Sequence, residues 1–192
     1  MTLALITAPT AEPVTLEELR VYALIDHIDD DAIIAGLGRA AREFVEAFTG
    51  LALASATWEL TARAWPAGIM VLPKPPLQNV VTVKHRDVTG NVVTLAANTD
   101  YVVDLPGGAI EPVRAWPAVG DYPDAVQVRF TAGFASAELV PQSAKLAIMA
   151  LTCHWYEQRE PATTNEGATR RVPLHVKALL AQLRGGRLEM AT

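Results

Sequence analysis

Apolar residues recur at every third or fourth position near both ends of the chain and at every second position in its middle, which predicts helices, then strands, then helices. Thr15 and Glu18 have the spacing of a capping box and predict a short helix over residues 16–24. An acidic triplet, residues 29–31, precedes a second helix that we expect to end at Gly50. The apolar stripe of this second helix is formed by Ile33, Leu37, Ala40, Ala41, Phe44 and Phe48, with Arg39, Arg42, Glu43 and Glu46 mostly off it.

From Thr57 onward the period is two, which is typical of strands with one buried face. Residues 87–91 are rich in turn formers and predict a hairpin between the strands on either side. Residues 106–123, rich in proline and glycine, are expected to form one long loop. The expected strands cover residues 57–64, 69–72, 80–86, 92–95, 101–104 and 126–130, in a single-faced antiparallel sheet.

Helical character returns at Pro141 and continues to about Gln158. This helix is apolar almost all round, so we expect a partner subunit to cover part of it. The fold class is therefore α+β: a helical bundle core of two N-terminal and two C-terminal helices with an inserted antiparallel β region. We expect one α+β domain over residues 1–160, with helices at about 15–50 and 140–158 and the β insertion at about 55–132, followed by a mobile linker and a last helix within residues 161–192.

The composition is that of a folded protein, since 51% of the 192 residues are hydrophobic and 19% are charged. A net charge of −5 argues against a protein that grips nucleic-acid phosphates. The first residues lack the positive segment of a secretory signal, and the longest apolar stretch, residues 146–156, is too short to span a bilayer. We therefore expect no membrane partner.

Candidate chemistry is sparse. The histidines His27, His85, His154 and His175 lie in different elements without metal-ligand spacing, and the acidic triplet lacks the spacing of a calcium loop. Cys153 is expected to be a buried structural thiol, and no nucleophile elbow or phosphate-binding glycine loop occurs. We expect no catalytic residue, metal or cofactor. The basic C-terminal residues suit a solvated end or an acidic protein partner equally well.

The order of segments carries more information than any single motif. Four stretches carry it: residues 11–18 with 30–50; residues 58–60, 72–77, 80–83 and 100–101; residues 128–134 leading into 140–160; and residues 172–184. In this order they resemble the head-to-tail connector, or adaptor, proteins of long-tailed double-stranded DNA phages, prophages and gene transfer agents. Residues 185–192 extend beyond where many relatives end.

The resemblance implies a ring, usually dodecameric, in the neck of a virion or gene-transfer-agent particle made in the bacterial cytoplasm. The ring would lie between the portal protein and a stopper or tail-terminator protein, and DNA would pass through it without specific binding. The C-terminal segment would be a docking helix that binds the portal, through Arg170, Arg171, Val172, Pro173, Val176, Leu179, Leu180, Leu183 and Arg184. Contacts between subunits are expected at Leu146, Met149, Trp155 and Tyr156.

Because carboxylates repel the phosphates of passing DNA, we also expect some acidic residues to face the channel. The candidates are Glu17, Glu18, Asp29, Asp30, Asp31, Glu43 and Glu46.

Two other functions compete with the virion adaptor: an intracellular self-associating module outside any particle and, less favoured, an enzyme with an unrecognised site. Ring formation or portal binding would support the adaptor, stable small oligomers with another partner the module, and a pocket with paired titratable groups the enzyme.

Overall fold

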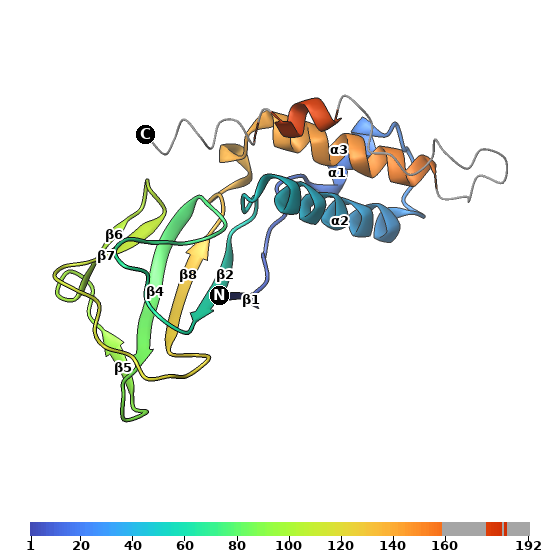
Figure 1. Ribbon diagram of the computed structural model, residues 1–192. Helices are drawn as coiled ribbons and strands as arrows, with labels where there is room; N and C mark the ends of the chain where they lie inside the picture. The colour runs from blue at the N-terminus through green and yellow to red at the C-terminus, as the bar shows by residue number, and fades with distance from the viewer. Residues whose placement is uncertain (159–175, 182, 184–192) are drawn as a thin grey trace. The chain divides into compact units, whose positions relative to one another are not determined.

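The computed structural model describes residues 1–158, 176–181 and 183 (Figure 1). The chain forms two compact units: a sheet unit of Met1–Ala11 and Ala54–Ala135, and a helical unit of Glu12–Leu53 and Ser136–Thr192. The fold is α+β with antiparallel strand pairing, as the sequence predicts. The elements in chain order are β1 (Thr2–Thr7), α1 (Leu16–Tyr22), α2 (Asp31–Thr49), β2 (Ala56–Ala62), β3 (Met70–Val71), β4 (Leu77–Arg86), β5 (Val92–Leu95), β6 (Tyr101–Asp104), β7 (Ala109–Pro112), β8 (Val126–Ala132), a 3₁₀ turn (Ala137–Leu139) and α3 (Gln142–Glu157).

The helical unit begins with the predicted capping box. The backbone N–H of Thr15 donates to Glu18 Oε2 at 2.7 Å, and the Glu18 N–H donates back to Thr15 Oγ1 at 3.2 Å. These bonds satisfy N–H groups that no helical carbonyl can reach, and so α1 begins here. α2 ends at Gly50, whose φ of 76° is the left-handed stop that the sequence predicts.

The three helices pack against one another, with α2 and α3 side by side (Figure 1). α2 buries Ile34, Ala41 and Val45. This corrects the predicted core face: Ile33 and Phe48, at the two ends of the predicted stripe, are 44% and 40% exposed. Apolar residues cover more than half of the circumference of α2, so their periodicity alone does not select the face that the neighbouring helices cover.

The sheet unit contains two sheets where the sequence predicted one. The five-stranded sheet has the order β1-β2-β8-β4-β5, and the three-stranded sheet has the order β3-β7-β6. Two strands were missed. β1 lies in the N-terminal segment and pairs with β2, whereas β7 lies inside the predicted long loop and pairs with β3 and β6. The partner of β1 is distant in the sequence, which a local pattern does not reveal, whereas β7 pairs with the neighbouring β6 but is short and lacks clear alternation.

β8 is the central strand of the five-stranded sheet and confirms the predicted alternation. Val126, Val128, Phe130 and Ala132 are fully buried, and the residues between them are partly exposed. The predicted β4–β5 hairpin is also confirmed. Its turn is held by the Asp87 carboxylate, which accepts the N–H groups of Thr89 and Asn91 at 2.8 and 2.9 Å.

Stacked tryptophans hold the segment between β7 and β8. The rings of Trp65 and Trp116 are nearly parallel, with centroids 4.2 Å apart, and Trp116 Nε1 donates to the Gly68 carbonyl at 2.6 Å. Trp116 therefore anchors this segment.

Gly133 ends β8 at a position that only glycine tolerates. Its φ is 116°, and a Cβ atom there would collide with the carbonyl oxygen of Ala54. We predict that Gly133→Ala lowers the free energy of unfolding by about 3 kcal/mol, because backbone strain adds to the collision. Urea denaturation followed by tryptophan fluorescence measures this.

The matched control is Gly36→Ala in α2, where a Cβ atom meets nothing within 4 Å. Alanine should stabilise this helix by about 0.5–1 kcal/mol. Equal urea midpoints for Gly133→Ala and the wild type would contradict the role assigned to Gly133.

Candidate assembly surfaces

A buried arginine organises the helical unit. The side chain of Arg42 is only 8% exposed; its Nε donates to Glu12 Oε2 at 2.7 Å and its Nη1 to Glu46 Oε2 at 3.0 Å. The other oxygen of Glu46 accepts the backbone N–H of Leu53 at 2.8 Å. Burial lowers the pKa of Arg42, but the carboxylates of Glu46 and Glu12 outweigh it and leave the pKa raised. One ion cluster therefore ties α2 to the segments before α1 and after α2.

This cluster removes Glu46 from the acids that can face a channel. Its carboxylate is 6% exposed and engaged by Arg42 and Leu53, so we no longer count it among the candidates. In the sequence, Arg42 and Glu46 lie mostly off the apolar stripe. Their i,i+4 spacing is the same as that of an ion pair on an exposed helix surface, so the spacing does not indicate burial. Only the tertiary structure shows that the pair is buried.

The acidic residues at the start of α1 and α2 have partners inside the helical unit. Glu18 caps α1, and its Oε1 lies 3.8 Å from Lys145 Nζ. The hydrogen bond from the Thr15 backbone holds the pKa of Glu18 below its usual value. Asp30 Oδ2 accepts the Tyr156 hydroxyl at 2.6 Å, and Asp31 lies 3.6 Å from Arg20.

Besides Glu18, which is exposed although it caps α1, three of the predicted channel acids are exposed: Glu17, Asp29 and Glu43. Glu43 is 69% exposed although its Oε1 lies 3.5 Å from Arg42 Nη2. These three present carboxylates to the surroundings of the helical unit.

The four residues expected between subunits have different surroundings. Leu146 is 40% exposed, and Met149, one helical turn further along α3, is half-buried. Trp155 packs edge-on against Phe44 of α2 with ring centroids 6.2 Å apart, and Tyr156 is bonded to Asp30. Within this chain, therefore, Trp155 and Tyr156 connect α3 to α2, whereas Leu146 points outward.

The predicted portal-binding set is described only in part. Arg170, Arg171, Val172, Pro173 and Arg184 lie outside the described residues, as does most of the predicted 161–192 segment. Val176–Ala181 and Leu183 are helical; Val176 and Leu180 are fully buried, and Leu179 and Leu183 are partly exposed. Docking through Val176 or Leu180 would require this helix to leave its present position.

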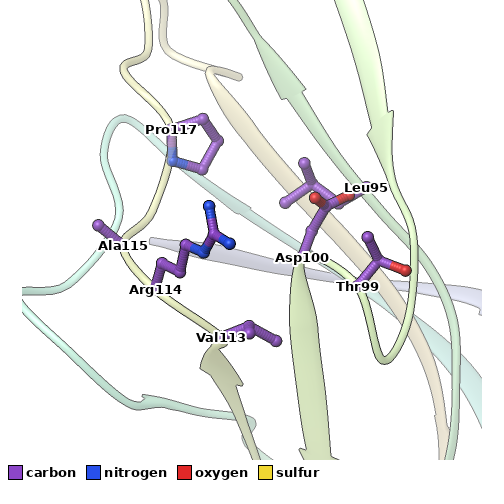
Figure 2. A pocket seen from close by; sticks show the side chains of 7 residues that line it. All are labelled: Leu95, Thr99, Asp100, Val113, Arg114, Ala115 and Pro117. Atoms are coloured by element: carbon purple, nitrogen blue, oxygen red, sulfur yellow. The ribbon is translucent and has the colours of Figure 1, made fainter.

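The sheet unit contains a pocket of about 370 Å³ (Figure 2). Thr99, Asp100 and Arg114 supply its polar groups, and Leu95, Val113 and Pro117 are among its apolar walls. The carboxylate of Asp100 accepts the Ala96 N–H at 2.8 Å, and Arg114 lies on the exposed rim. Its polar groups form no nucleophile–base pair.

In the part of the chain that the structure describes, no three His, Cys, Asp or Glu residues lie close enough together to bind a metal ion. The Cys153 thiol is half-buried, and burial raises its pKa, which disfavours the reactive thiolate. No helix among residues 1–158, 176–181 and 183 is long and apolar enough to cross a membrane.

Comparison with known proteins identifies the family. A model of the family described as "Head completion protein" matches residues 12–184, and the chain belongs to this family. No protein with a curated description matches the chain.

Solved structures of gene transfer agent particles match over nearly the whole chain. A chain of the neck of an empty particle, computed with C6 symmetry, is 28% identical, with a TM-score of 0.77. One from a native virion is 27% identical with a TM-score of 0.78, and one from a native neck with C12 symmetry is 29% identical with a TM-score of 0.69. Each match covers 96% of this chain and 95% of the other.

The resemblance to head-to-tail connectors is therefore confirmed. The chain is a structural head-to-tail connector of a particle neck and not an enzyme.

The buried ion cluster generates a stability prediction. Arg42→Met should lower the free energy of unfolding by about 3–5 kcal/mol, because the Glu46 carboxylate stays buried without its cation. The double variant Arg42→Met/Glu46→Met should lose less than the sum of the two single variants, because neither buried charge is left alone. Chemical denaturation of all three variants measures the coupling.

Arg39→Met is the matched control, since Arg39 is exposed on the same helix. It should change the free energy of unfolding by less than about 0.5 kcal/mol. Additive losses in the double variant would show that Arg42 and Glu46 act independently.

Proposed function

We propose that this chain forms one ring of a particle neck, bound to the portal on one side and to a stopper or tail-terminator protein on the other, with DNA passing through its centre. The observation that carries the proposal is the match of 96% of the chain to neck subunits of gene transfer agent particles. We also propose that the helical unit is a four-helix bundle in which the helix of residues 176–183 joins α1, α2 and α3, and that residues 1–160 act as one adaptor domain carrying the β insertion.

Twelve copies are the ring size that we propose. A closed ring of twelve identical subunits has both twelve-fold and six-fold rotational symmetry, and the matched necks carry the labels C12 and C6. A ring subunit needs two different complementary faces, one for each neighbour. This requirement agrees with the exposed position of Leu146 on α3; we retain Leu146 and the half-buried Met149 as residues between subunits.

The charge of the chain suits a channel through which DNA slides. The net charge is −5, and Glu17, Asp29 and Glu43 are exposed in the helical unit. We propose that some of these acids line the channel, where they repel phosphate and keep DNA from binding.

We propose that the C-terminal segment, which contains Arg170, Arg171 and Arg184, binds the portal. Arginine forms paired hydrogen bonds with carboxylates, so an acidic portal surface is the partner that this segment fits.

Ring formation is the first test. The full chain, mixed with its portal ring, should co-purify with it, and negative-stain images should show an added ring on the portal. Particle mass then counts the copies. If the folded chain does not bind an intact portal ring, the result contradicts the proposed function and favours a self-associating module outside any particle.

Charge variants test the docking segment. Arg170→Glu/Arg171→Glu should weaken portal binding by about 10-fold or more, because two attractive contacts become repulsive. Arg114→Glu, an exposed arginine of the sheet unit, is the control and should bind nearly as the wild type does. Unchanged portal affinity in the double variant, with an unchanged melting temperature, would refute docking through this segment.

A further inference from the structure

α2 carries two apolar faces; the described chain buries one of them fully and the other only in part. The inner face holds Ile34, Ala41 and Val45, which are fully buried. The second face, which we name the outer α2 stripe, consists of Ile33, Leu37, Ala40, Phe44, Ala47 and Phe48. At 100° per residue these side chains occupy one sector of the helix, whereas Arg39 and Glu43 occupy another.

The outer α2 stripe is long and uncharged. From Ile33 to Phe48 it extends for about 22 Å along the helix. Ala40 and Ala47 are exposed, and Phe44 is half-buried beside Trp155. Continuous apolar surface of this kind is rare on monomers and marks places where another molecule binds.

The middle of the outer α2 stripe is shallow. Gly36 lies beside Ala40, and a Cβ atom built on Gly36 meets no other atom within 4 Å. Small residues such as Gly36 and Ala40 let another helix approach α2 closely, so that its larger side chains can pack between Ile33 and Phe44.

We propose that a second copy of this chain covers the outer α2 stripe, through Leu146 and Met149 on the outer face of its α3. The proposal rests on the ring proposed above, in which each copy contacts its neighbours through two different faces. Leu146 and Trp155 are nine residues apart, which is two and a half helical turns. Because Trp155 contacts α2 of its own chain, Leu146 points away from that α2 and is available to the next copy.

Crosslinking tests the contact directly. Ala40→Cys and Leu146→Cys are introduced together with Cys153→Ser, so that the two new cysteines are the only ones, and the full chain is assembled on the portal ring. Oxidation should produce a denaturing-gel ladder of dimers, trimers and larger multimers, because each copy is linked to both neighbours. Chains with only one of the two new cysteines should produce no ladder. A crosslink between position 40 and residues 159–175 of the same chain, found by photocrosslinking from position 40, would overturn the proposal, because the chain would then cover its own stripe.

A charge placed in the stripe gives an independent readout. Ala40→Glu should weaken assembly between copies by about 100-fold or more, because it buries a carboxylate without a partner. Ala32→Glu is the matched control, since Ala32 is an exposed alanine of the same helix outside the stripe; it should assemble within about threefold of the wild type. Mass photometry of portal complexes at decreasing concentration measures the assembly, and circular dichroism checks that both variants fold.

The outcomes separate this proposal from the proposed function. If the wild type forms no ring on the portal, the proposed function itself fails. If the wild type forms rings and Ala40→Glu forms them equally well, the ring stands and the outer α2 stripe is not its interface.

Discussion

The buried guanidinium of Arg42 connects the segments of the helical unit that flank α1 and α2. Arg42 binds Glu12, the first residue of this unit, and Glu46, which in turn holds the backbone N–H of Leu53, the last residue before the chain leaves for the sheet unit. A buried charge is stable only while its partners remain in place. The cluster therefore holds against α2 the residues at which the chain first enters and first leaves the helical unit.

With Arg42 facing inward, the orientation of α2 about its own axis is set. Ile34, Ala41 and Val45 enter the core, and Ile33, Ala40 and Phe48 turn outward. The same choice brings Phe44 against Trp155, which orients α3 so that Leu146 is exposed. A neck subunit works through surfaces that meet other subunits, and here those surfaces follow from the packing of the core.

Much of this protein could be predicted from local patterns. The capping box of Thr15 and Glu18, the left-handed Gly50 and the Asp87 turn each depend on residues a few positions apart. The alternation in β8 was clear because the strand is central and one of its faces is fully buried. The family was identified from the order of such segments, and the family model and the solved necks confirm it.

The sequence by itself determined the helix–strand–helix order, the antiparallel pairing and the membership of a family of neck proteins. Only the tertiary structure decided which face of α2 is buried, that Arg42 and Glu46 form a buried pair, and that β1 and β7 are strands. The physical reason is the same for the face of α2, for the buried pair and for β1. Periodicity records that a side chain is apolar, whereas burial and strand pairing depend on partners such as Glu12 or β2 that lie far away along the chain and close in space.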